Sequence, residues 1–292
     1  MRIEDLKGLN AVESANKIRK YYFGGAIFSI VTLFILLFIY FILAPFMSKH
    51  YILYIIIFID VVSIALLKQL KRQTKAHLIM NEVIHEACDP AKYVEMADYL
   101  HNKIPYKNNY KAFLGTNYAM AKLLTRDYEK TIEHINIVKT QSKQYKKSAF
   151  MQYCLNNVKT SLYLQMGDIE KAKLYYSELQ QIKTKLNQKV IINNNIDALL
   201  LNIDSQFAYK ENRVTDAEQL IIQSMNSFNK APSRLDNIVL NYNFGNIELA
   251  LGKYKEASDH FEIVLELGQD AKVDYIDYAK EKLEECRQNL QK

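Results

Sequence analysis

The sequence predicts an all-α fold, in which a transmembrane hairpin of two helices precedes a solenoid of antiparallel helix pairs. Two apolar runs near the N-terminus, a scarcity of helix breakers and a recurring turn motif predict this architecture. The 292 residues include only 4 prolines and 8 glycines, which favours long helices over a β-rich domain.

The two apolar runs cover about 21–47 and 51–70, and only residues 48–50 separate them. A bilayer core of about 30 Å needs about 20 apolar residues per helix. A linker this short joins antiparallel neighbours. A secretory signal peptide has a shorter apolar region and ends in a small-residue cleavage site. The sequence therefore predicts a transmembrane hairpin over 21–70.

Basic residues cluster before and after this hairpin, at the two ends that would lie on the same side of a membrane. They are Arg2, Lys7, Lys17, Arg19 and Lys20 before it, and Lys68, Lys71, Arg72 and Lys75 after it. Lysine and arginine accumulate on the cytoplasmic side of short flanks. We therefore expect a multi-pass protein of a bacterial cell membrane with both termini cytoplasmic, residues 1–20 forming a cytoplasmic N-terminal segment. This topology, with anionic lipid, also explains much of the net charge of +6.

One carboxylate interrupts the second apolar run near its middle. Asp60 lies between Ile59 and Val61, where an ionised side chain costs several kcal/mol, roughly, in a bilayer. Antiparallel pairing of the two helices places Asp60 near Tyr40. Asp60 either makes a polar contact, within the hairpin or to a partner transmembrane helix, or is simply tolerated there.

Residues 71–105 predict a helical pair between the hairpin and the solenoid. No breaker interrupts the chain from the second apolar run to about Glu86. Asp89 and Pro90 then form a strong helix start, with Asp89 as the N-cap and Pro90 at the first helical position. The helix that follows is expected to end at about Lys103, before Pro105.

A short motif recurs four times in residues 106–292. In each copy a turn residue precedes a polar residue, an apolar residue and, five positions after the turn, a small residue. The copies span 125–131, 166–172, 211–217 and 251–257, with turn residues Arg126, Gly167, Asn212 and Gly252. The turn residues are spaced by 41, 45 and 40 positions. Such a period indicates stacked helix pairs, which bury their apolar faces only against one another.

These units resemble the tetratricopeptide repeat. The last unit carries the family pattern as Phe244-Gly245, the turn Gly252, the small residue Ala257 and the aromatic Phe261. The resemblance implies antiparallel helix pairs over 106–292, with a C-terminal capping helix from about 273 to 290. The period exceeds the usual ~34 residues of this family, and we expect longer helices to account for the difference.

The resemblance also implies a concave groove, lined by the first helix of each pair, that binds a protein or peptide ligand. Asparagine side chains in that groove hold the ligand in this family. The candidates at or next to matching positions are Asn117, Asn157, Asn202, Asn243 and Asn246. Val158 and Ile203 occupy groove positions where a carboxylate clamp needs polar groups, so we do not expect a complete clamp.

No pattern of catalytic residues is found in the sequence. The phosphate-binding loop, the nucleophile elbow and the usual spacings of metal ligands are missing. The three cysteines are far apart, and free thiols are expected in the cytoplasm. One small cluster, Lys143, Lys146 and Lys147, does not form the basic stripe of a nucleic-acid interface. We therefore expect neither an enzyme, a cofactor, a metal site nor a nucleic-acid partner.

Together these features predict a non-enzymatic, membrane-anchored adaptor or scaffold, whose partners are a peptide or protein in the groove and the lipid bilayer. Two other functions stay open. The protein is a peptide-sensing regulator if a bound peptide changes the pitch of the solenoid. It is an accessory subunit of a membrane complex if Asp60 is its intramembrane contact.

Overall fold

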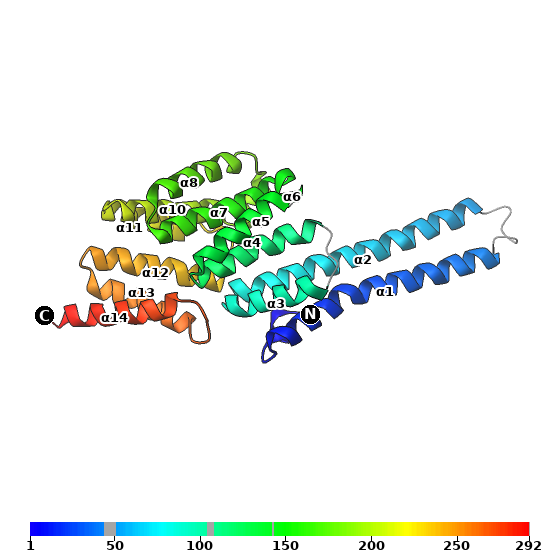
Figure 1. Ribbon diagram of the computed structural model, residues 1–292, viewed down its shortest axis with the longest axis horizontal. Helices are drawn as coiled ribbons and strands as arrows, with labels where there is room; N and C mark the ends of the chain where they lie inside the picture. Colours follow the sequence, from blue (N-terminus) through cyan, green and yellow to red (C-terminus); the bar gives the residue numbers. More distant parts are fainter. Residues whose placement is uncertain (44–50, 104–107, 142, 292) are drawn as a thin grey trace. The chain divides into compact units, whose positions relative to one another are not determined.

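The computed structural model describes the backbone of residues 1–43, 51–103, 108–141 and 143–291. Every regular element in these ranges is helical, as expected (Figure 1). The chain divides into two compact units, Met1–Glu82 and Val83–Lys292. The division falls inside a helix, upstream of the boundary expected near residue 106.

Unit 1 contains a short 3-10 helix, η1 (Ile3–Leu6), and two long antiparallel helices, α1 (Ala11–Leu43) and most of α2 (Tyr51–His85). Helix α1 begins ten residues before the apolar run, because Asn10 and Glu13 form a reciprocal capping box. The Glu13 amide donates to Asn10 Oδ1 at 2.9 Å, and the Asn10 amide donates to Glu13 Oε2 at 3.0 Å. The Gln69 side chain joins the two helices by donating to the Tyr22 carbonyl at 2.9 Å.

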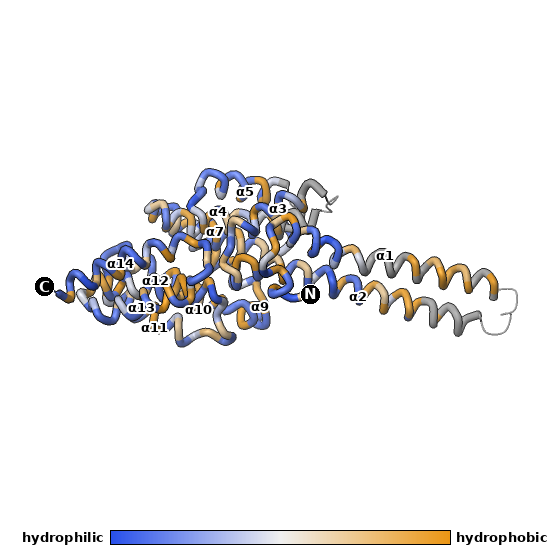
Figure 2. The backbone as a smooth tube through the Cα atoms, turned by 90° about the horizontal axis from the view of Figure 1, so that it is seen from below, coloured by the Kyte–Doolittle hydropathy of each residue, from blue (hydrophilic) through white to orange (hydrophobic). Residues whose placement is uncertain are grey.

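Large apolar side chains project from α1 and α2 into solvent. Phe34 and Phe38 are each 68% exposed, and Ile59 is 54% exposed. Figure 2 shows many hydrophobic residues among the coloured residues of both helices, and hydrophilic ones toward the chain's N-terminus and the end of α2. Within the part of the chain that the structure describes, no helix is long and apolar enough to cross a membrane. The expected turn at 48–50 and the Tyr40 side chain lie outside the described residues.

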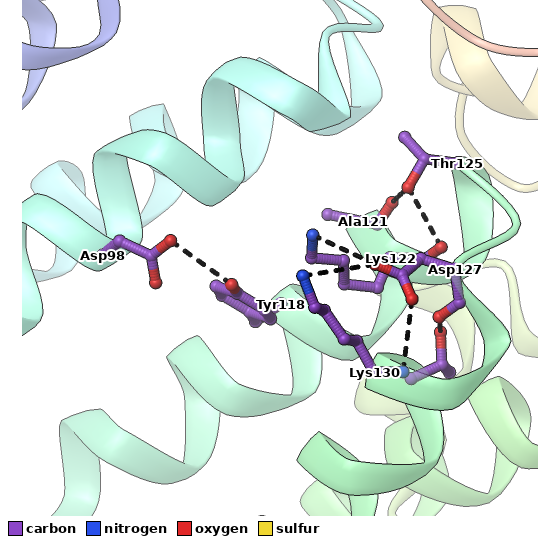
Figure 3. A network of polar contacts seen from close by, with 8 residues as sticks. Asp98, Tyr118, Ala121, Lys122, Thr125, Asp127 and Lys130 are labelled. Carbon is purple, nitrogen blue, oxygen red and sulfur yellow. Dashed lines mark hydrogen bonds and ion pairs between the residues drawn. The ribbon is translucent and has the colours of Figure 1, made fainter.

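Helix α2 runs without a break to His85, and α3 (Pro90–Lys103) follows in unit 2. This confirms the predicted continuation of the second helix and the predicted helix start at Pro90. Asp89 caps α3: its Oδ1 accepts from the Lys92 amide at 3.0 Å. On α3, the Asp98 carboxylate accepts a hydrogen bond of 3.3 Å from the Tyr118 hydroxyl on the next helix (Figure 3).

The rest of unit 2 consists of helix pairs joined by tight turns. The pairs pack as α4 with α5, α7 with α8, α10 with α11, and α12 with α13. Their bounds are Asn108–Leu124 and Tyr128–Gln141, Ala149–Met166 and Ile169–Lys183, Ile196–Lys210 and Val214–Asn226, and Arg234–Ala250 and Tyr254–Leu267. The first helices also contact one another, α4 with α7, α7 with α10 and α10 with α12, so the pairs stack side by side.

The turn within each pair has the conformation that the repeated motif predicts. Arg126, Gly167, Asn212 and Gly252 have φ values of 53°, 77°, 60° and 73°, all left-handed. Five positions on, the small residues Thr131, Ala172, Ala217 and Ala257 are fully buried. These small residues let the two helices of a pair approach closely. In the last pair the approach leaves no space for a side chain at Gly245, where a Cβ would lie 2.8 Å from Phe261 Cε1.

The long period has a different cause from the one expected. The pairs span 108–141, 149–183, 196–226 and 234–267, close to the ~34 residues of a standard repeat. The additional residues lie in the connections, which contain the short helices α6 (Lys143–Lys147) and α9 (Gln188–Asn193). The expectation of longer helices was therefore wrong, because the motif marks only the turns and does not show where the inserted residues fold.

Helix α14 (Tyr275–Leu290) completes the unit, close to the predicted range, and packs on α13 and α12. It buries Ile276, Ala279, Leu283 and Cys286. The loop before it returns to the start of unit 2. The Lys272 amide donates to the Cys88 carbonyl at 2.8 Å, and Lys272 Nζ lies 2.8 Å from Asp89 Oδ2.

Candidate groove lined by the first helices

The first helices of the four pairs enclose a cavity of about 460 Å³. Helix α4 contributes Met120, Leu123 and Leu124, and α14 adds Tyr275. The other lining residues come mainly from α7, α10 and α12: Asn157, Ser161, Leu164, Gln165, Leu199, Asn202, Ile203, Gln206, Tyr209, Lys210, Leu235, Asp236, Val239, Leu240, Tyr242, Asn243, Asn246 and Ile247. We call this cavity the groove.

Four of the five asparagines predicted from the sequence line the groove. They are Asn157 on α7, Asn202 on α10, and Asn243 and Asn246 on α12. Asn117, on α4, is half-buried and is not one of the lining residues. The structure therefore brings asparagines from three successive pairs to one cavity.

In the two middle pairs the candidates Asn157 and Asn202 lie one residue before the matching positions, which Val158 and Ile203 occupy. Neighbouring residues on a helix point about 100° apart, so Asn157 and Val158 project from different sides of α7. Asn157 faces the groove, whereas Val158 is buried in the core between Leu155 and Leu162. Ile203 is buried, with 4% of its surface exposed, and is also one of the residues that line the groove.

Hydrogen bonds order some of these amides. Asn243 Nδ2 donates to Asn202 Oδ1 at 3.1 Å, from one pair to the next. Asn246 Nδ2 donates to the Tyr242 carbonyl at 2.8 Å, one turn back on its own helix. The first of these bonds fixes the Asn202 and Asn243 side chains relative to each other in the lining of the groove.

Sequence reasoning did not single out several further polar residues of the groove. Gln165 and Gln206 add two carboxamides, and Tyr209, Tyr242 and Tyr275 add three phenol rings. Gln206 lies one helical turn after Asn202, so the i, i+4 spacing of polar residues on a largely apolar helix was the available signal. Tyr275 comes from α14, and nothing local in the sequence indicates its place in the groove.

The charged residues of the groove are mostly engaged by the protein itself. Asp236 belongs to a capping box and accepts from the Ser233 amide at 3.1 Å. Arg126 Nε lies 3.7 Å from Asp274 Oδ2, and its guanidinium lies 4.1 Å from the Tyr278 ring centroid. Lys210 is an exposed cation at the end of α10. The lining is therefore rich in neutral hydrogen-bonding groups.

A separate buried cluster lies between α12 and α13. His260 Nδ1 lies 2.8 Å from Asn241 Oδ1, and His260 Nε2 lies 3.6 Å from Glu248 Oε2. Burial, with the nearby charges of Glu256 and Glu218, raises the pKa of Glu248 to about 7. None of these three residues lines the groove.

Polar contacts on another part of α4 and α5 stabilise the first pair. Figure 3 shows Asp127 between Lys122 and Lys130, whose amines lie 3.4 and 3.8 Å from its carboxylate. Asp127 also caps α5 by accepting from the Lys130 amide at 3.3 Å. The charges of this cluster are therefore used in capping and pairing.

Within the described ranges, no three or more histidine, cysteine or acidic side chains gather closely enough to hold a metal ion. Comparison with known proteins gives no assignment: no family model, curated protein or solved structure matches this chain. The groove is therefore the principal candidate site, and a function for it has to be inferred from the chemistry of its lining residues.

Proposed function

We propose that this protein is a non-enzymatic adaptor of the tetratricopeptide type, anchored in a membrane, that binds an extended segment of a partner protein in the groove. The observation that carries the proposal is the set of carboxamides lining one cavity: Asn157, Gln165, Asn202, Gln206, Asn243 and Asn246. An extended peptide presents unpaired N–H and C=O groups, and a carboxamide both donates and accepts hydrogen bonds.

The size and polarity of the groove support this ligand class. About 460 Å³ lies in the range of ~300–1,000 Å³ usual for small-ligand sites. It suits a few residues of peptide rather than a folded domain. Leucine, isoleucine and valine residues between the amides offer contacts for apolar side chains of the peptide, while the amides hydrogen-bond to the peptide backbone. Because Arg126 is paired with Asp274, it does not offer its charge to a terminal carboxylate, so the groove favours an internal segment over a C-terminus.

The exposed apolar side chains of α1 and α2 support the membrane anchor. Exposing side chains such as Phe34 and Phe38 to water costs roughly 1.5–3 kcal/mol each relative to burial. A lipid bilayer removes that cost over both helices. The basic residues that flank the hairpin match the cytoplasmic side of such an anchor.

Asp60 favours a second candidate function, that of a subunit in a membrane complex. It is exposed on α2 beside Ile59, which is 54% exposed. A carboxylate on an apolar helix face is suited to pairing with a polar group of a partner transmembrane helix. Replacement of Asp60 by Leu tests this function: loss of a co-purifying membrane partner supports it, and unchanged recovery contradicts it.

Site-specific photo-crosslinking in the native membrane tests the groove. A photo-reactive phenylalanine analogue replaces Tyr209 inside the groove, and in a second variant it replaces Ile222, which is 42% exposed on α11. We expect a protein crosslinked from position 209 and not from position 222. Crosslinks of equal yield from both positions, or none from position 209, would contradict the proposal.

A pair of alanine variants completes the test. Asn157→Ala removes an amide from the groove, whereas Asn226→Ala removes an exposed amide on α11 that does not line it. We expect the first to reduce recovery of the crosslinked partner about tenfold, as removal of a good hydrogen-bonding group does. The second should leave recovery unchanged.

A further inference from the structure

A side chain of the first helix pair reaches the terminal helix at the wall of the groove. Arg126, in the turn between α4 and α5, lies 3.7 Å from Asp274 Oδ2 just before α14. Its guanidinium lies 4.1 Å from the ring centroid of Tyr278 on α14. The contact joins residues 148 and 152 positions apart.

The backbone makes arginine an unfavourable residue at this turn. The φ of Arg126 is 53°, in the left-handed region that glycine enters at no cost and asparagine at a small one. The equivalent turn residues of the other pairs are Gly167, Asn212 and Gly252. The turn alone therefore does not explain an arginine, and the contacts of its side chain supply a reason for its presence.

The residues around Arg126 form the kind of site that binds a cation. Asp274 supplies a carboxylate and Tyr278 an aromatic face, the two groups that hold lysine and arginine side chains. Arg126, Asp274 and the neighbouring Tyr275 all line the groove. The Arg126 and Asp274 side chains are 43% and 45% exposed, so another cation can reach the site without unpacking the core.

We propose that Asp274 and Tyr278 form a cation subsite of the groove, which Arg126 fills in the unliganded protein, and that the recognised segment carries a lysine or arginine that takes its place. This inference rests on the proposed peptide-binding function and names the side chain that the partner must supply. Arg126 then acts as an intramolecular competitor that weakens the binding of segments without a basic residue.

The terminal helix remains attached when Arg126 leaves the subsite. Lys272 bonds the Cys88 carbonyl through its amide and pairs with Asp89 through its amine. Arg234 donates to the Leu267 carbonyl at 2.6 Å and pairs with Asp270. Exchange of one cation for another at Asp274 therefore does not require the end of the solenoid to separate.

Binding of two blocked tripeptides to the full chain in detergent tests the proposal. The probes are acetyl-Gly-Arg-Gly-amide and acetyl-Gly-Gln-Gly-amide, titrated by saturation-transfer NMR. In Arg126→Gly the subsite is empty and the turn is relaxed. We expect this variant to bind the arginine probe about tenfold more tightly than the wild type, a change of about 1.4 kcal/mol. Binding of the glutamine probe should stay the same.

Three controls define the outcome. Asn212→Gly changes the same turn position in the third pair and should not alter binding of the arginine probe. The double variants Arg126→Gly with Asp274→Asn, and Arg126→Gly with Tyr278→Leu, should lose the gain. Arg126→Gln, which keeps the side-chain stem, should reproduce the gain if Arg126→Gly folds poorly. Equal affinity of the wild type and both Arg126 variants, or a gain that survives Asp274→Asn, would overturn the proposal.

The photo-crosslinking experiment separates this inference from the proposed function. If position 209 crosslinks no protein, the groove is not a peptide site and the proposed function fails. If it crosslinks a partner whose recovery is unaffected by replacing the basic residues of the bound segment with glutamine, only the cation subsite fails. Reduced recovery after that replacement supports both.

Discussion

The Asn195 side chain forms hydrogen bonds with both the amide and the carbonyl of Lys230, 35 residues away. Asn195 Oδ1 accepts from the Lys230 amide at 3.0 Å, and Asn195 Nδ2 donates to the Lys230 carbonyl at 3.1 Å. The same Oδ1 accepts from the Asn229 amide at 3.1 Å. Asn195, the N-cap residue of α10, thus fixes the connection between α11 and α12 and so the spacing of α10 and α12, which both line the groove.

Replacing Asn195 with alanine should destabilise unit 2 by about 2–4 kcal/mol. The change leaves two partly buried amides without an acceptor and keeps a left-handed φ of 50° that alanine adopts poorly. Asn194→Ala, at an exposed neighbour, is the control and should cost less than about 1 kcal/mol. Urea unfolding of the full chain measures both, and equal midpoints would contradict the role of Asn195.

Gly245→Ala should destabilise the last helix pair by about 1–3 kcal/mol. The new Cβ would lie 2.8 Å from Phe261 Cε1 and 2.9 Å from Cζ, closer than carbon atoms pack. Phe261→Leu makes room for the methyl group. The double variant should therefore be more stable than the sum of the two single effects predicts, and thermal unfolding would show this coupling. Simple additivity would show that the ring does not limit the approach.

Glu248 should make the stability of unit 2 depend on pH. Its folded pKa of about 7 exceeds the value of 4.5 for an ordinary glutamate, so the folded state holds a proton that the unfolded state has lost. The contribution of Glu248 to the free energy of unfolding therefore falls as pH rises from about 4.5 to about 7, by a few kcal/mol at most, and does not change further above that range.

Glu248→Gln should remove this pH dependence. The amide keeps the shape of the side chain and carries no charge, so the variant should be more stable than the wild type at pH 8. Glu266→Gln, an exposed site on α13, should retain the wild-type slope. Parallel slopes for all three proteins in urea titrations from pH 4 to pH 8 would exclude Glu248 as the cause. Burial lowers the pKa of His260, which lies 3.6 Å from Glu248, and His260→Gln tests its contribution separately.

Asp89 should contribute more to stability than its ion-pair partner Lys272. Asp89 is 8% exposed and caps α3, whereas the Lys272 side chain is 66% exposed. Asp89→Ala should cost about 1–2 kcal/mol through the lost cap. Lys272→Met should cost less than about 1 kcal/mol, because exposed ion pairs are weak. Asp89→Ser keeps a capping oxygen and should restore most of the loss in calorimetric unfolding. A Lys272→Met effect as large as that of Asp89→Ala would contradict this ranking.

The local elements of the fold could be predicted from the sequence because their causes are local. The turn positions Arg126, Gly167, Asn212 and Gly252 followed from one motif, and each has the left-handed φ that ends a helix. The Asp89-Pro90 start of α3 followed from capping chemistry. Four of the five asparagines that the resemblance to the tetratricopeptide repeat suggested line the groove, and Asn117 does not.

Other features depend on side chains that are far apart in the chain. No local pattern predicts that Arg126 contacts Asp274, that Lys272 pairs with Asp89 or that Tyr275 lines the groove. Each depends on the stacking angle of the pairs and on where the connections α6 and α9 place their extra residues. The prediction that longer helices account for the long period was wrong for the same reason.

The sequence by itself determined the all-helical class and the repeated turns, because breakers and turn residues act locally. It indicated four of the groove asparagines and missed Gln165 and Gln206. The tertiary structure decided which helix faces meet around one cavity and which charges are already paired there. Packing over more than a hundred residues sets these relationships, since the position of each helix pair depends on the pairs that it contacts.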